Sequence, residues 1–173
     1  SSTPDGYRDT ETSLCPYCSK VMNKGLVGIF EGLHDDPEKA KIIKTRMGVA
    51  AATKYYVDNK CVVCWPPPDD KGDWDMIAVP DNGIGNPIKV QVKTTGYIHP
   101  SNGNSWIVGL KDGGYISQEK VKVPWNFDEL CILDGDGEVT VMKSSDILIK
   151  SDGTVRKHSI VVPRFPSKAR LPL

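Results

Sequence analysis

The first clear pattern of apolar and polar positions has the period of a helix. Apolar side chains recur at close to helical spacing at Ala40, Ile43, Met47, Ala50, Ala51 and Tyr55. Asp36 can cap the helix, and Pro37 suits its first position. The spacing therefore predicts a helix that begins at Pro37 and ends near Asp58, with Gly48 as a weak point in its interior.

The remaining apolar segments are short and are separated by turn residues, which is typical of strands. The predicted strands are residues 61–65, 74–79, 88–94 and 106–110, followed by a hairpin of 127–133 and 138–142. A short helix or turn is expected at 144–149. One long helix followed by strands indicates an α/β or α+β fold.

Composition divides the chain into three parts. Residues 1–35 form an N-terminal extension, 36–150 contain the predicted elements, and 151–173 form a basic C-terminal tail. The tail owes its charge to Arg156, Lys157, His158, Arg164, Lys168 and Arg170. No signal-like segment is visible in the extension, so nothing favours a secreted protein.

Four of the five cysteines form two Cys-x-x-Cys pairs, Cys15 with Cys18 and Cys61 with Cys64. Two such pairs fit a tetrahedral structural zinc site, and the first pair has the character of a zinc knuckle. The odd count of cysteines disfavours a disulfide scaffold.

Two alternatives to this four-cysteine site stay open. The β-branched Val62 and Val63 favour a strand, in which Cys61 and Cys64 would point to opposite faces. The first pair could also bind zinc with His34 and one further ligand.

The charge balance excludes some functions. The chain has 22 basic and 22 acidic residues, so its net charge is zero, which argues against a protein that coats nucleic acid non-specifically. No apolar run approaches the ~20 residues of a membrane span, so no membrane partner is expected. The distribution is uneven, however, since four aspartates gather at 69–75 and 156–170 is basic without an acid. Opposed patches of charge are compatible with a specific site.

Three residues of two predicted strands form the candidate catalytic group. Gln91 and Lys93 are two positions apart, so their side chains leave the same face of a strand, and Asp75 can reach that face from the neighbouring strand. A carboxylate and an amide oxygen can hold Mg²⁺, and a lysine can position water or stabilise negative charge. The alternative is an ordinary half-exposed strand with one polar face.

The region from Gly48 to Thr95 resembles the PD-(D/E)xK nuclease superfamily. It is most similar to the branch of intron-associated and phage homing endonucleases that carries a Gln-x-Lys variant of the motif. The shared pattern is a helix near a glycine, a strand ending in proline, an acidic strand start and Gln-Val-Lys-Thr-Thr. These features are here Gly48, Cys61–Pro66, Trp74–Val79 and Lys89–Thr95, and the later hairpin at Phe127–Val141 also fits.

The resemblance implies a restriction-endonuclease-like core, with a mixed central sheet flanked by helices, over roughly 40–145. It implies an endonuclease dependent on Mg²⁺ or Mn²⁺ that hydrolyses phosphodiester bonds in double-stranded DNA, at a specific site. Asp75 would bind the metal, Gln91 would take the (D/E) position as a second metal ligand, and Lys93 would be the lysine. Cutting both strands calls for a homodimer or larger homo-oligomer, expected in the cytoplasm of a bacterial or phage-infected cell.

Candidate DNA contacts lie after the motif. The resemblance assigns Thr94 and Thr95 to the phosphate backbone, and His99 follows in a loop rich in Gly and Asn. Further basic candidates, which could equally be ordinary surface residues, are Lys111, Lys120 and Lys122.

One position departs from the family pattern. Many relatives carry a glutamate after the helix glycine, and this chain has Val49. Asp69, Asp70 and Asp73 are candidates to replace that acid. The departure keeps two alternatives open, a Holliday-junction or repair nuclease with the same site and a catalytically inactive DNA-binding module.

Overall fold

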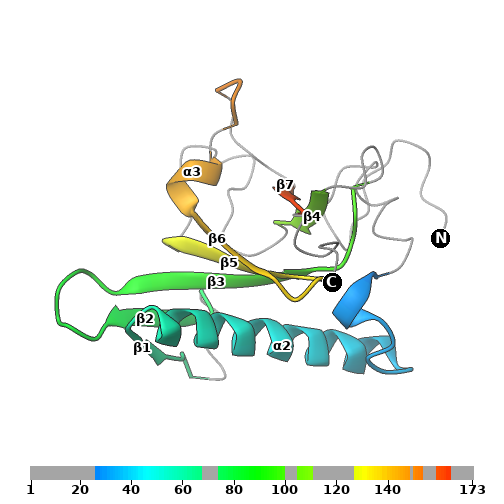
Figure 1. Cartoon of the computed structure of the whole chain (residues 1–173), viewed down its shortest axis with the longest axis horizontal. Helices are drawn as coiled ribbons and strands as arrows, with labels where there is room; N and C mark the ends of the chain where they lie inside the picture. The colour runs from blue at the N-terminus through cyan, green and yellow to red at the C-terminus, as the bar shows by residue number, and fades with distance from the viewer. Residues whose placement is uncertain are drawn as a thin grey trace, which may run out of the picture.

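The computed structural model describes residues 26–67, 74–99, 105–110, 127–148, 150–153 and 159–164. A five-stranded sheet carries the long helix α2 on one face and a two-stranded sheet with the short helix α3 on the other (Figure 1).

Helix α2 (Pro37–Asp58) has the bounds that the sequence predicts. The Asp36 carboxylate accepts a hydrogen bond from the Glu38 N–H at 2.9 Å, and Pro37 occupies the first turn, so the predicted cap is confirmed. The shorter 3₁₀ helix η1 (Gly28–Phe30) precedes it. Within the described ranges, no helix is both long and apolar enough to cross a membrane.

The large sheet is mixed. Its order is β1-β2-β3-β5-β6, with β3 and β5 parallel and the other neighbours antiparallel. The strands are β1 (Cys61–Cys64), β2 (Met76–Pro80), β3 (Ile88–Thr95), β5 (Glu129–Asp134) and β6 (Val139–Lys143). The predicted mixed central sheet and the α+β class are therefore confirmed.

The small sheet pairs β4 (Ser105–Gly109) with β7 (Ser159–Pro163) in antiparallel register. The sequence analysis assigned β7 only to a basic tail, because charged segments surround its five residues. Together with α3 (Ser144–Leu148), this sheet covers the face opposite α2. Among the described residues, the layer opposite α2 therefore consists mainly of strands beside one short helix.

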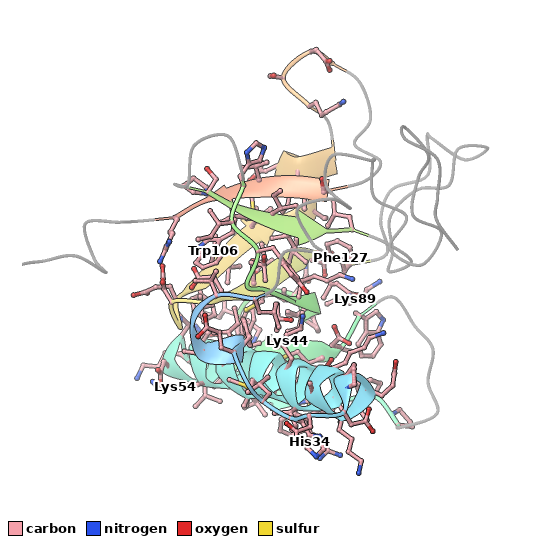
Figure 2. All side chains as sticks on the ribbon, turned by 90° about the vertical axis from the view of Figure 1, so that its right-hand side faces the viewer. His34, Lys44, Lys54, Lys89, Trp106 and Phe127 are labelled. Carbon is pink, nitrogen blue, oxygen red and sulfur yellow. The ribbon has the colours of Figure 1, made fainter. Side chains whose placement is uncertain are left out.

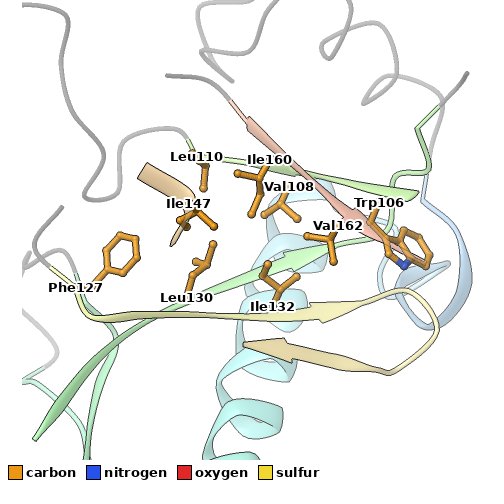
Figure 3. Packing of buried hydrophobic residues seen from close by; sticks show 9 residues of the cluster. All are labelled: Trp106, Val108, Leu110, Phe127, Leu130, Ile132, Ile147, Ile160 and Val162. Carbon is orange, nitrogen blue, oxygen red and sulfur yellow. The ribbon is translucent and has the colours of Figure 1, made fainter. Parts of the chain in front are cut away.

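Strand β5 contributes to two hydrophobic clusters, one on each face of the large sheet. Leu130 and Ile132 point toward the small sheet and α3, whereas Cys131 packs with Ala52 and Tyr56 of α2. Figure 3 shows the first cluster, which contains Trp106, Val108, Leu110, Phe127, Leu130, Ile132, Ile147, Ile160 and Val162. Burial on both faces fixes the register of β5 and, through it, that of the parallel strand β3.

Gly48 allows α2 to approach β3 closely. A Cβ atom at this position would lie 2.7 Å from Cγ2 of Thr94 and 3.1 Å from Cγ1 of Val92. Both neighbours are β-branched and stiff at χ1, so they cannot easily move aside. The glycine that weakens the helix is therefore required by packing against the strand.

We expect the Gly48→Ala substitution to destabilise the protein by about 1–3 kcal/mol, because overpacking outweighs the gain in helix propensity. Helix propensity alone predicts the opposite sign, a gain of about 1 kcal/mol. Urea unfolding followed by circular dichroism measures the difference. The reference is Ala50→Gly at an exposed position of the same helix, which reports the propensity effect alone. A Gly48→Ala variant more stable than the parent protein would contradict the packing argument.

Candidate functional site

The candidate site lies where β2 and β3 separate. The two strands pair from Ala78 to Met76, which stands opposite Val90, and β3 then continues to Thr95 without β2 beside it. Asp75 occupies this fork. Its N–H donates to the Val90 carbonyl at 2.7 Å, and its Oδ2 accepts a hydrogen bond from the Val92 N–H at 2.7 Å. The carboxylate thus takes the place of the backbone carbonyl that would accept the next hydrogen bond between the two strands.

The strand register places Asp75 beside the predicted pair on β3. Because Met76 stands opposite Val90, the preceding Asp75 falls opposite Gln91, on the sheet face that Gln91 shares with Lys93. All three residues line one cleft of about 650 Å³ at the open edge of β3. Gln91 is only 9% exposed, and Asp75 and Lys93 are partly buried. The structure therefore brings together the three residues that the sequence analysis selected.

Helix α2 forms another wall of the cleft, although it packs on the face of β3 that carries Val92 and Thr94, not the face of Gln91 and Lys93. Lys41, Lys44, Thr45 and Val49 all line the cleft. Val49 stands where the family pattern has a glutamate, so α2 contributes cations and an apolar side chain at this wall and no carboxylate. Among the described residues, the lining of the cleft holds three lysines and a single acid.

The segment that leads into η1 closes one end of the cleft. Val27 N–H donates to the Gly96 carbonyl at 2.8 Å, and Ile29 N–H donates to the Gly135 carbonyl at 2.9 Å. These acceptors directly follow the parallel strands β3 and β5, and Leu26 thereby reaches the cleft. Gly28 has a φ of +81°, and a Cβ there would overlap the backbone of Gly135. This wall was not predicted from the sequence, although the glycines that follow both strands are a signal for it.

Burial dominates the electrostatics of Asp75. It raises the pKa of the carboxyl group above its usual range, while the Val92 N–H and the nearby Lys93 oppose this change only in part. An ionised Asp75 therefore lowers the free energy of unfolding. Raised pKa values of this kind are common for carboxylates at functional sites.

The residues present can hold a hard divalent cation only weakly by themselves. The described part of the chain contains no group of three or more His, Cys, Asp or Glu residues suited to a metal ion. Asp75 and Gln91 offer a carboxylate and an amide oxygen. Mg²⁺ is often bound by one or two carboxylates together with water and substrate phosphate, so these two residues fit an ion whose ligands the substrate completes.

The predicted DNA contacts fall in different places. Thr94 lines the cleft, whereas Thr95 is 1% exposed and its Oγ1 donates to the Ile107 carbonyl at 2.5 Å. This burial leaves Thr95 no surface to offer a phosphate, so it is withdrawn as a DNA contact and joins β3 to β4 instead. The backbone N–H of His99 donates a hydrogen bond to the Ser105 carbonyl, and His99 does not line the cleft. Lys111, Lys120 and Lys122 lie outside the described residues.

The two cysteines of β1 differ in burial. Burial alternates along the strand, with Cys61 partly buried toward α2 and Cys64 exposed on the other side. The alternation does not favour the second pair as ligands of one ion, and the four-cysteine zinc site stays a prediction. Cys15 and Cys18, like Asp69, Asp70 and Asp73, lie outside the described residues. His34 is described, and its Nδ1 accepts a hydrogen bond from the Asp36 N–H at 2.9 Å.

Comparison with known proteins gives few matches. No protein-family model matches the chain, and no curated protein matches it. Among solved structures, the chain is similar to "a bacterial homing endonuclease: I-Ssp6803I", with 19% sequence identity and a TM-score of 0.49. The alignment covers 75% of this chain and 80% of that one.

We expect the Asp75→Asn substitution to raise the melting temperature at pH 7 by about 1–3 °C. The asparagine keeps an acceptor for the Val92 N–H and removes the buried charge. Since the pKa of Asp75 is raised on folding, the penalty is present above that raised pKa and disappears as the pH falls toward 3.8, the ordinary value. Thermal unfolding of both proteins between pH 7 and pH 3 tests this. A lower melting temperature for the variant at pH 7 would contradict it.

Proposed function

We propose that this protein is a metal-dependent DNA endonuclease that hydrolyses phosphodiester bonds in double-stranded DNA, at a specific site. The observation that carries the proposal is the convergence of Asp75, Gln91 and Lys93 on one cleft at the fork of β2 and β3. The same three residues carry the resemblance to PD-(D/E)xK nucleases, so the sequence pattern and the geometry support one site.

Each side chain has a role that suits its position. Asp75 has two carboxylate oxygens, so Oδ1 can ligate a cation while Oδ2 keeps its bond to the Val92 N–H. Gln91 adds a neutral oxygen ligand from the same sheet face. A bound Mg²⁺ or Mn²⁺ would supply Lewis-acid polarisation of the phosphate and a bound water of lowered pKa.

Lys93 would act on the reacting phosphate. It leaves β3 on the same face as Gln91, and its charge favours the ionised form of Asp75. An ammonium group at this position can orient the attacking water and stabilise the negative charge that develops on the phosphate oxygens. Because the cleft is partly enclosed, that interaction is stronger than it would be in bulk water.

A second candidate function is a DNA-binding module without catalytic activity. The observation that favours it is that Asp75 is the one carboxylate along the described lining of the cleft, since Val49 and Gln91 stand where acids are expected. A nuclease that acts on branched or damaged DNA would use the same site and differs only in its substrate. Cleavage assays on several substrates separate these cases.

We expect the protein to cleave plasmid or genomic DNA in the presence of Mg²⁺ or Mn²⁺. We expect Lys93→Ala and Asp75→Asn to lower the cleavage rate at least about a hundredfold, because each removes a group that acts on the transition state. The control is Lys39→Ala, an exposed lysine of α2 outside the cleft. Direct conversion of supercoiled plasmid to linear DNA, without nicked circles, would indicate two active sites acting together in a homodimer or larger assembly.

The substrates include linear duplexes, plasmids and four-way junctions, so that a junction nuclease is not missed. If the parent protein cuts none of them with either metal while it binds duplex DNA, the inactive module is the better description. If the parent protein and Lys93→Ala cut equally fast, Lys93 is not catalytic.

The Gln91→Glu substitution tests the metal site separately. It adds a second carboxylate beside Asp75, and carboxylate charge strengthens the binding of hard cations. We expect the Mg²⁺ concentration at half-maximal cleavage to fall by about tenfold in the variant. Titration of the cleavage rate with Mg²⁺ measures this, with Gln91→Ala as the reference that removes the oxygen ligand. An unchanged midpoint in both variants would remove Gln91 from the metal site.

A further inference from the structure

Lys44 occupies an unusual position on the wall of the cleft that α2 provides. Its Nζ lies 5.9 Å from the centre of the Phe30 ring in η1 and 5.5 Å from the centre of the Tyr97 ring, just after β3. Figure 2 shows Lys44 on the side of α2 that faces η1. Tyr97 lines the cleft as well, so three segments of the chain meet around this ammonium group.

In the part of the chain that the structure describes, Lys44 is surrounded by cations and aromatic rings and has no counter-ion. No salt bridge joins Lys44 to a carboxylate among the described residues. Burial lowers its pKa, and the neighbouring Lys41 lowers it further. Two rings hold an ammonium group by cation–π attraction, but they do not neutralise its charge. A partly buried ammonium group with no carboxylate partner among the described residues favours the binding of an anion.

The charge of the whole cleft indicates which anion. Lys41, Lys44 and Lys93 outnumber Asp75 three to one along its described lining, and the cleft therefore favours an anion even before a divalent cation is added. A site rich in carboxylates repels the DNA backbone in the absence of metal, whereas the described lining of this cleft attracts it.

We propose that Lys44 binds a phosphate of the DNA backbone, held in place by Phe30 and Tyr97, and that this contact forms without a divalent metal. The inference rests on the proposed function for the identity of the ligand, but not for catalysis. Lys44 is a binding residue that positions the duplex at the cleft that Asp75, Gln91 and Lys93 also line. One phosphate contact contributes affinity that depends strongly on salt and little on base sequence.

The experiment measures binding of a short labelled DNA duplex in EDTA, by fluorescence anisotropy, over a series of salt concentrations. Lys44→Met keeps the apolar stem between the two rings and removes the charge. Lys44→Arg keeps the charge. Lys39→Met removes a charge from an exposed position of the same helix, outside the cleft, and is the matched control.

We expect Lys44→Met to weaken binding by about tenfold at moderate salt and to reduce the slope of log K against log salt by about 0.9. Lys44→Arg should restore most of both values, and Lys39→Met should change them little. The melting temperature of Lys44→Met should stay close to that of the parent protein, which separates lost binding from lost folding.

The outcomes distinguish this inference from the proposed function. A parent protein that binds no duplex in EDTA, or a Lys44→Met variant with the same affinity and salt slope as the parent, would overturn the phosphate contact even if the protein cuts DNA with Mg²⁺. Loss of binding in Lys44→Met by a protein that cuts no substrate would support the contact and refute the endonuclease. Equal losses in Lys44→Met and Lys39→Met would indicate general attraction to the surface and overturn a specific site.

Discussion

The hydrogen bond from the Val92 N–H to Asp75 Oδ2 is the interaction on which the candidate site depends. Strand β3 loses its β2 partner at this point, and an unpaired strand edge beside a cleft would otherwise expose a backbone donor. One side chain satisfies that donor and, through the same bond, fixes its own carboxylate beside Gln91. The same hydrogen bond therefore satisfies the backbone of the sheet and positions the carboxylate of the cleft.

That bond holds its geometry only because β3 is fixed on its other sides. The parallel pairing with β5 runs from Val90 to Thr95, beyond the point where β2 has departed. Gly48 lets α2 pack directly against the same segment, and the Thr95 hydroxyl ties it to β4. A strand that is open along one edge and supported elsewhere can present its side chains to a ligand without loss of order, which a preorganised site requires.

Local sequence signals sufficed for much of this structure. The cap at Asp36, the bounds of α2 and the alternation along β3 follow from backbone preferences over a few residues. The sequence also predicted that Asp75 can reach the face of Gln91, and the strand register shows it opposite that residue. Strand β7 did not emerge, because its two buried residues are too few to stand out and its partner β4 is far away in the chain. The Phe30–Lys44–Tyr97 contact is equally non-local, since three separate elements must fold before it exists. Tertiary packing, rather than propensity, decides both features.

The zero net charge of the chain conceals a cleft whose described lining is basic, because charges of both signs are distributed unevenly over the fold. Arg164, from the segment predicted as a basic tail, donates two hydrogen bonds to the Asp136 carboxylate and stacks over Trp106, so it serves packing. Lys54 is paired with Asp58 on α2. Such pairs contribute little field beyond their immediate surroundings, whereas Lys41 and Lys44 lie along a cleft whose described residues include one acid. The net charge of the sequence cannot show which charges are paired and which face the cleft. That distinction depends on the contacts that the fold makes.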